Sequence, residues 1–233
     1  MQRRQFTPAL AALVLARTAC AGLLGATTEA LALGETEAAA GVRAALERGA
    51  GSAVSLLGRP GGFLDNPQVR IPLPAALKSA ATMLRAIGQQ RRVDELVMAM
   101  NRAAEQAVPA AKPLLINAVR TMSVDDAVKI VRGGDTSVTD FFAAKTRVQL
   151  GEKFLPIVTA ETNKLALAAK YDAVADKGVA LGLVKAEDAS VEQYVTRKAL
   201  DGLFLMIGQE ERKIRADPVG SGSAILKAVF GAH

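Results

Sequence analysis

Polar side chains with helical spacing occur in two groups along the chain. Asn101, Arg102 and Glu105 form one group, and Lys198 and Asp201 form the other. Residues three or four apart lie on one face of a helix, and each group borders an apolar stripe, so the groups could line a polar pocket between helices. The alternative is that they form ion pairs at the edge of the core, which fix how neighbouring helices align. The sequence leaves both interpretations open.

Acid–base catalysis would have to rest on carboxylates in this chain. Glu105, Asp201 and Asp135 are the candidates, because two carboxylates in one cleft can act as a general acid and a general base. Their spacing in the sequence does not bring them together. Residues 135–140 begin like a calcium loop, but the sixth position is not glycine and the twelfth is not glutamate. We therefore expect no metal site there.

Histidine and cysteine are almost absent. The one cysteine is Cys20, and the one histidine is the last residue, His233. Zinc sites built from these residue types are therefore not expected, nor are mechanisms that use a Ser-His-Asp triad or a Cys-His pair. The chain also has no P-loop and no glycine-rich dinucleotide motif. We expect no metal and no cofactor, and catalytic residues stay unassigned.

A segment rich in proline and glycine, Gly58–Pro74, interrupts the helical pattern. It reads GRPGGFLDNPQVRIPLP and cannot form a single helix. Long loops inside compact domains are often functional. Within it, Phe63 would offer an apolar tip, and residues 69–71 would be briefly extended. The candidate interaction residues are Arg59, Phe63, Asp65, Asn66 and Arg70. The alternative is a rigid loop laid over the helices.

Helices must position these residues, because apolar residues recur at helical spacing and no stretch alternates as a strand would. We expect helices over residues 37–57, 77–87, 93–108, 154–178 and 190–216, helices that begin at Pro109, Ser123 and Ser137, and a tail helix near 225–230. The helix over 37–57 is weakened at Gly49 and Gly51. The helix over 77–87 is ended by Gly88 and has Leu77, Ala81 and Ile87 on one core face. Pro156 lies in the first turn of the helix over 154–178. The prediction is an all-α fold: a single-domain bundle of about eight helices over residues 33–233 with one long Pro/Gly-rich loop.

Three of these helix starts carry the residues of a capping box. In that motif a serine hydroxyl accepts from an amide three residues later, while the later side chain reaches back to the serine amide. The predicted pairs are Ser123 with Asp126, Ser137 with Asp140, and Ser190 with Gln193.

Residues 1–32 are typical of a cleaved signal peptide. Arg3 and Arg4 give a positive start, a short apolar run follows, and residues 30–32 read Ala-Leu-Ala, as a cleavage site would. The apolar run is too short to span a bilayer, so we expect a periplasmic protein with no transmembrane segment in the mature chain. The alternatives are lipid attachment at Cys20 and a cytoplasmic N-terminal segment.

The formal net charge is +6, and part of it comes from the leader. In the rest of the chain, basic and acidic residues alternate along the predicted helices, which is typical of a solvated face. A nucleic-acid-binding protein would show a basic stripe with aromatic side chains for stacking, whereas this chain has no Trp and two Tyr. We expect no nucleic-acid partner.

Several short motifs follow one another in order from about Val42 to Phe230. They are Gly58–Pro67, Val69–Pro74, Asn101–Pro109, Gly133–Asp135, Phe154–Val158, Tyr194–Phe204 and Ile214–Pro218. Together they resemble the bacterial domain-of-unknown-function family numbered 4197. The resemblance implies a helical, exported protein of Gram-negative-type bacteria. It implies no activity and assigns no catalytic residue.

These observations favour a periplasmic, non-catalytic protein that binds a partner protein or an amphiphilic ligand of the envelope. This interpretation predicts an apolar groove or cavity, or an exposed apolar patch near Phe63. One alternative is a hydrolase in which Glu105, Asp201 or Asp135 meet in one concave site. Another is a purely structural role in the envelope. The sequence does not specify the ligand, the oligomeric state or the export route, whether general secretory or twin-arginine.

Overall fold

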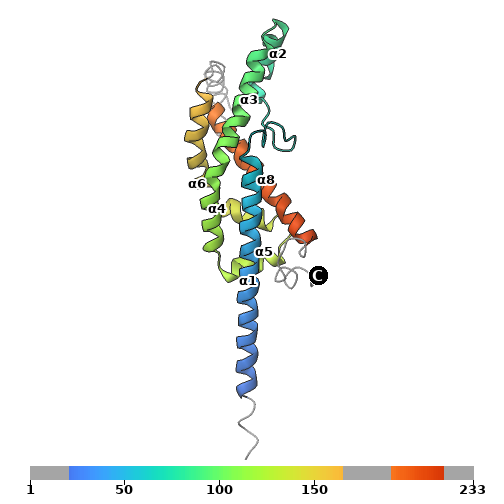
Figure 1. Ribbon diagram of the computed structural model, residues 1–233, viewed down its shortest axis with the longest axis vertical. Coiled ribbons are helices and arrows are strands. Elements are labelled where there is room, and N and C mark those ends of the chain that lie inside the picture. Colours follow the sequence, from blue (N-terminus) through green and yellow to red (C-terminus); the bar gives the residue numbers. More distant parts are fainter. Residues whose placement is uncertain (1–20, 165–189, 218–233) are drawn as a thin grey trace, which may run out of the picture.

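The computed structural model describes residues 21–164 and 190–217, and in these two ranges every regular element is helical and no strand is present. The all-α prediction is therefore confirmed. Figure 1 shows an elongated molecule in which the N-terminal part of α1 (Ala21–Leu57) projects from one end and α2 (Lys78–Ala86) lies at the other. The predicted tail helix near residues 225–230 lies outside the described ranges.

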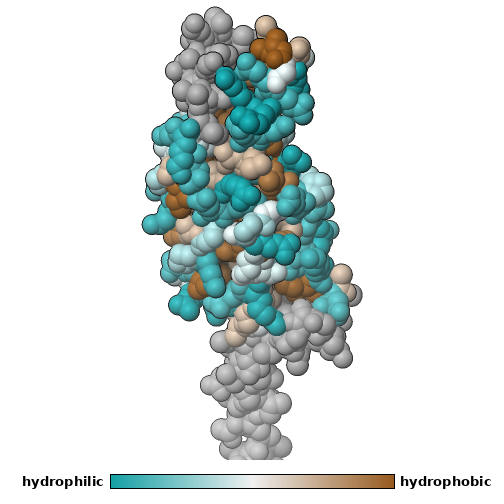
Figure 2. Space-filling model, turned by 45° about the horizontal axis from the view of Figure 1, so that its top comes forward, coloured by the Kyte–Doolittle hydropathy of each residue, from teal (hydrophilic) through white to brown (hydrophobic). Residues whose placement is uncertain are grey.

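The core is centred on two long helices, α6 (Ser137–Thr162) and α8 (Val191–Ala216), which pack against each other and against α3 (Gln90–Ala107). Large side chains fill this contact, among them Phe142 and Phe154 of α6 and Leu203 of α8, all fully buried. On the outside, Figure 2 shows a mostly hydrophilic face with separate apolar patches. The helices therefore form one hydrophobic core covered by polar residues.

Helix α1 is longer and more regular than predicted. It begins at Ala21 rather than near Glu37, and it continues through Gly49 and Gly51 without a break. Its side from Ala39 onward packs against α8, α4 (Ala111–Arg120) and α5 (Val124–Arg132). Tertiary packing of this kind outweighs the low helix propensity of two glycines, which costs about 1 kcal/mol each.

Helix α6 also runs across a predicted boundary. The sequence was expected to begin a new helix near Phe154 with Pro156 in its first turn, but Pro156 lies inside α6. A proline removes one backbone hydrogen bond, and here the proline and Glu152, whose carbonyl loses its partner, are both exposed to water. The buried neighbours Phe154 and Val158 hold the helix on the core across this point.

Helix α2 ends just before Gly88, as predicted, and the chain turns there so that α2 and α3 form a hairpin. Gly88 has a φ of +76°, and the amide of Gln89 donates to the carbonyl of Leu84 at 2.7 Å, which closes the last turn of α2. A 3-10 turn, Ala75–Leu77, precedes α2. The prediction for Ile87 is wrong, because this residue lies past the end of the helix and is 67 % exposed.

The capping box at the start of α5 is confirmed. The amide of Asp126 donates to the Ser123 hydroxyl at 3.0 Å, and the amide of Ser123 donates to the Asp126 carboxylate at 3.2 Å. The hydrogen bonds from the Ser123 side chain and then from its backbone lower the pKa of Asp126 below its ordinary value of 3.8.

At the start of α8 half of the predicted box is confirmed, since the Ser190 hydroxyl accepts from the amide of Gln193 at 3.2 Å. The third predicted box is wrong. Helix α6 begins at Ser137 with Thr136 as its cap residue, and no side chain of the expected pair caps it. The Ser137 hydroxyl donates instead to the carbonyl of Ile130 at 2.9 Å.

The segment Gly58–Pro74 is a loop, as predicted, and it connects α1 to the 3-10 turn before α2. Turns occupy it as far as Val69, where the amides of Val69 and Arg70 both donate to the carbonyl of Asn66, so the predicted extended stretch at 69–71 is wrong for Val69. Residues 70–74 lie in no turn and in no regular element. The alternative of a rigid loop laid over the helices is the one that its contacts favour.

Candidate functional site

Glu105 of α3 holds the first half of the Gly58–Pro74 loop. Its Oε1 atom accepts hydrogen bonds from the amides of Phe63 and Leu64, each at 3.0 Å. The side chain belongs to the buried part of α3, with 5 % of the residue exposed. A buried carboxylate costs several kcal/mol unless hydrogen bonds compensate it, and here two loop amides do so.

Asn101 of α3 holds the second half of the loop. Its Oδ1 atom accepts from the amide of Ile71 at 2.8 Å, and its Nδ2 atom donates to the carbonyl of Ile71 at 2.9 Å and to that of Val97 at 2.8 Å. The amide side chain thus pairs with both backbone groups of one residue, as a neighbouring strand would. Asn101 is fully buried, so each of these bonds replaces one to water.

The spacing of Asn101 and Glu105 explains how two side chains fix the whole loop. They lie one turn apart on the same face of α3, as the sequence predicted, and they hold loop positions 63–64 and 71. The pair therefore does not line a pocket between helices. Its partners are backbone atoms of the loop, which no spacing in the sequence could identify.

Helix α8 supports the other side of the loop. The Tyr194 hydroxyl donates to the carbonyl of Pro72 at 3.1 Å. Gly202 lies against Phe63, and a Cβ atom there would come within 2.8 Å of the phenylalanine ring. Phe63 is fully buried in this contact, so the prediction of an exposed apolar tip is wrong. The glycine of α8 provides the space that takes the ring into the core.

Two glycines let the loop fold back over the end of α1. Gly61 has a φ of +80°, which favours glycine. A Cβ atom on Gly62 would overlap the carbonyl oxygens of Leu56 and Leu57. The backbone at these positions is thus determined by close approach as well as by hydrogen bonds.

The outer face of the loop forms an open depression of about 440 Å³. Arg59 and Asp65 are exposed at it, and Asn66 is half-buried. The Asn66 side chain accepts from the amide of Gln68 at 3.1 Å, which stabilises the turn. Within the described part of the chain, the side chains of Arg59, Asp65 and the exposed Arg70 make no ion pair or hydrogen bond. They are available to a partner.

The remaining candidate residues lie elsewhere. Asp201 accepts from Arg147 of α6 at 3.1 Å and lies 3.5 Å from Arg197, so it belongs to an ion-pair group at the edge of the core. Arg147 also stacks over the ring of Phe204 at 5.0 Å. Asp135 is exposed between α5 and α6, Arg102 is exposed on α3, and Lys198 is half-buried on α8.

The three carboxylates of the hydrolase alternative have no partner in common. Glu105 binds loop amides, Asp201 binds two arginines, and Asp135 is exposed in a turn. Neither the depression over the loop nor the small cavity described below is lined by any two of them. In the described residues we also find no group of three or more His, Cys, Asp or Glu that could hold a metal ion.

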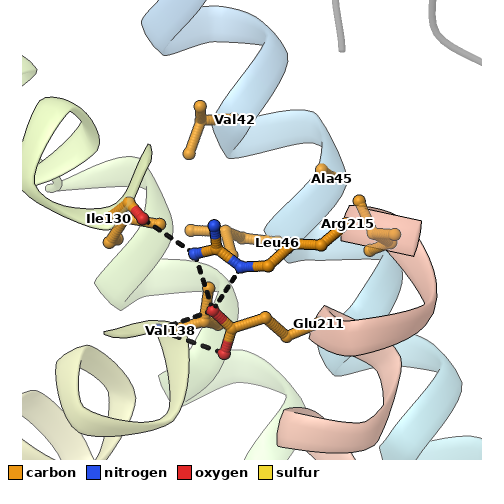
Figure 3. A pocket seen from close by; sticks show the side chains of 8 residues that line it. Val42, Ala45, Leu46, Ile130, Val138, Glu211 and Arg215 are labelled. Atoms are coloured by element: carbon orange, nitrogen blue, oxygen red, sulfur yellow. Dashed lines mark hydrogen bonds and ion pairs between the residues drawn. The ribbon is translucent and has the colours of Figure 1, made fainter. Parts of the chain in front are cut away.

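A buried polar network that the sequence did not reveal joins α8 to the start of α6 (Figure 3). The carboxylate of Glu211 accepts from the amide of Val138 at 3.3 Å and from Arg215 at 2.8 Å, and the same guanidinium donates to the Ile130 carbonyl at 2.8 Å. Glu211 is 4 % exposed. This carboxylate occupies the N-terminus of α6, which explains why Ser137 and Asp140 do not form their box.

The one available signal for this network was the four-residue spacing of Glu211 and Arg215 in the polar run at the end of α8. The cavity beside it is lined by Val42, Leu46 and Val138 among others and has a volume of about 20 Å³. That is room for one water molecule and not for an organic ligand. The network therefore joins helices and does not form a binding site.

A third buried carboxylate, Glu192, also joins two helices. Glu192, 7 % exposed, accepts from the hydroxyl of Thr162 at 2.8 Å and so ties the end of α6 to the start of α8. In the described ranges the buried carboxylates are Glu105, Glu192 and Glu211, and each is bonded to a group that positions backbone or a neighbouring helix.

Comparison with known proteins yields one match. A family model described as a protein of unknown function (DUF4197) matches residues 32–231. No curated protein and no solved structure matches the chain.

Proposed function

Because the chain belongs to the DUF4197 family of proteins of unknown function, we propose its role from its geometry: it is an exported, non-catalytic binding protein that presents the Gly58–Pro74 loop to a partner protein or peptide. The observation that carries this proposal is the use of two buried polar side chains, Asn101 and Glu105, to hold one surface loop.

A loop that only connects two helices has no need of such anchors. This one exceeds the roughly 12–15 residues beyond which irregular connections become uncommon in compact domains. It is also held from two helices at once, by Glu105 and Asn101 of α3 and by Tyr194 of α8. A preformed loop loses little conformational entropy when it binds, which favours affinity and selectivity.

The outward groups of the loop favour a polar partner surface. Arg59 and Asp65 carry opposite charges and are exposed at an open depression, and Arg70 is exposed further along the same loop. An amphiphilic ligand would instead need an apolar groove, and the loop side chains Phe63, Val69 and Ile71 are buried. A protein or peptide with complementary charges fits this surface better than a lipid-like molecule.

Export is the second part of the proposal and rests mainly on residues 1–32. Arg3, Arg4 and the Ala-Leu-Ala sequence at 30–32 have the properties of a cleaved leader. The family match begins at residue 32, where the leader is predicted to end, and this supports the boundary. In the described ranges, none of the helices combines the length and the apolar character that crossing a bilayer would require. N-terminal sequencing of the protein from a periplasmic extract tests this part.

The binding surface can be tested by site-specific photocrosslinking in the native host. A photoreactive residue in place of Arg59 or Asp65 should trap one defined adduct, and the same residue in place of Val148, which is 76 % exposed on α6, should not. Unmodified competitor chain should abolish the adduct, whereas competitor with Arg59→Glu and Asp65→Arg should not. Identical adducts at all three positions, or none at the loop, would overturn the proposal.

A further inference from the structure

The α2–α3 hairpin lies at one extremity of the molecule and exposes two large apolar side chains, Met83 on α2 and Ile87 at its C-cap. Met83 is 72 % exposed and Ile87 is 67 % exposed. They are four residues apart, so they project on the same side of this end. Figure 1 shows the α2–α3 turn beyond the rest of the described helices, and Figure 2 shows an apolar patch bordered by hydrophilic atoms at the same end.

Basic residues surround this apolar pair. From Lys78 to Val93 the chain has four basic residues and no acidic one; they are Lys78, Arg85, Arg91 and Arg92. All four are exposed. Arg91 pairs with Glu95 at 3.3 Å, while in the described ranges Lys78, Arg85 and Arg92 form no ion pair. The exposed Asp94 and Glu95 follow on α3, so residues 78–95 carry four basic and two acidic residues, and the end of the hairpin remains positively charged.

We propose that this basic, apolar tip, formed by residues 78–92 of the α2–α3 hairpin, binds the surface of an anionic lipid bilayer. Apolar side chains that project from a basic helical surface enter the boundary between headgroups and acyl chains, while lysines and arginines attract anionic headgroups. Gly88, with its φ of +76°, follows Ile87 directly and reverses the chain between α2 and α3. The contact is peripheral and reversible.

The size of the tip distinguishes a bilayer from a protein partner. A stable protein interface buries about 800 Å² on each side, whereas α2 has only nine residues, and the exposed large apolar side chains there are Met83 and, at its C-cap, Ile87. A fluid bilayer needs no matching shape, so a small convex tip is sufficient. The tip is also separate from the loop surface, because the residues that line the loop depression lie between Leu56 and Pro67.

The absence of tryptophan from the chain allows a direct test. Ile87→Trp in the full chain introduces one fluorophore at the tip, and Val148→Trp introduces one at an equally exposed position of α6. With vesicles of equal parts phosphatidylglycerol and phosphatidylcholine, we expect the emission of the Ile87→Trp chain to shift to shorter wavelength. The Val148→Trp chain should show no shift, and phosphatidylcholine vesicles should shift neither.

Vesicle co-sedimentation measures the affinity. The double substitution Arg85→Glu and Arg92→Glu should weaken binding to the anionic vesicles by roughly tenfold or more, and Met83→Ser with Ile87→Ser should weaken it severalfold. The matched control, Lys112→Glu with Lys153→Glu, changes the same charge at exposed positions of α4 and α6 and should have a much smaller effect. All of these side chains are exposed, so circular dichroism should report an unchanged fold.

Three results would overturn the proposal. The full chain could fail to bind anionic vesicles. The tip variants could bind as the unmodified chain does. The chain could bind while the emission of Ile87→Trp stays unchanged, which would assign the binding to another segment, such as the apolar N-terminal residues. The first result has one further form. If the chain does not bind vesicles, but the unmodified chain captures a protein that the tip variants do not capture, the partner of the tip is a protein and not a bilayer.

Discussion

Asn101 bonds to both the amide and the carbonyl of Ile71, thirty positions away in the sequence, with every atom of its side-chain amide group in use. The loop that contains Ile71 is consequently attached to the core through backbone atoms. The exposed side chains of Arg59, Asp65 and Arg70 take no part in this attachment, so they can serve recognition.

Removal of Asn101 should destabilise the protein. In Asn101→Ala the amide and carbonyl of Ile71 lose their partners in a buried position, and each unsatisfied group costs about 1–3 kcal/mol. We expect the free energy of unfolding to fall by roughly 2–4 kcal/mol, measured by denaturant titration. Arg102→Ala, at the exposed neighbouring position, should change it by less than about 0.5 kcal/mol. Equal effects of the two substitutions would contradict the anchoring role.

Gly202 should not tolerate a methyl group. In Gly202→Ala the new Cβ atom would lie 2.8 Å from the ring of Phe63, and overpacking of this kind costs about 1–3 kcal/mol. Gly51→Ala is the control, since no atom lies within 4 Å of its Cβ position and alanine should stabilise α1 by about 1 kcal/mol. The two substitutions should therefore shift the melting temperature in opposite directions.

The same clash can be relieved from the other side. Phe63→Leu shortens the side chain that faces Gly202, so the double variant should be less destabilised than the sum of the single variants. Strict additivity would mean that the ring moves away from the new methyl group at no cost, and the close approach of α8 to the loop would then not matter for stability.

The network of Glu211 and Arg215 should show strong energetic coupling. The guanidinium and carboxylate are largely buried and share bonds with Ile130 and Val138, so a double-mutant cycle with alanine should give a coupling energy of about 1–3 kcal/mol. The exposed pair Arg91–Glu95 on α3, which has the same four-residue spacing and lies at 3.3 Å, is the matched control and should give less than about 1 kcal/mol.

The pH dependence of α5 should follow Asp126. Its pKa is lowered in the folded protein, so the carboxylate stabilises the fold above its ordinary value of 3.8, and this contribution is lost as the pH falls through the lower, folded pKa. Ser123→Ala removes the largest cause of the shift. We expect the pKa of Asp126, followed by carbon NMR of the carboxyl group, to rise toward 3.8. Ser52→Ala, at an exposed position of α1, should leave it in place.

Local chemistry made much of the fold predictable. The Ser123 cap, the end of α2 at Gly88 and the irregular Gly58–Pro74 segment each depend on residues within a few positions of one another. The helical character of the rest follows from its apolar period. Membership of the family was likewise predictable, because its motifs occur in order along the chain.

Contacts between distant residues account for what was not predictable. The cap at Ser137 is displaced by Glu211, 74 positions away, and the ring of Phe63 is buried because a glycine of α8 leaves space for it. Likewise, the spacing of Asn101 and Glu105 identified a shared face of α3 but not the loop amides that face would bind. Each case depends on how the helices pack, which periodicity alone does not determine.

The attachment of the loop to α3 and α8 has a consequence for proteolysis. Arg70 offers an exposed cleavage site to trypsin-like enzymes, whereas Pro60 protects the bond after Arg59. The backbone around the Arg70 site is bonded on both sides, because the amide of Arg70 donates to the carbonyl of Asn66 and the amide of Ile71 donates to Asn101. A protease needs several residues in extended form, and this loop cannot provide them while α3 remains packed. Cutting there should therefore require the opening of the core, so a long surface segment would survive in a protease-rich compartment as well as a helix does.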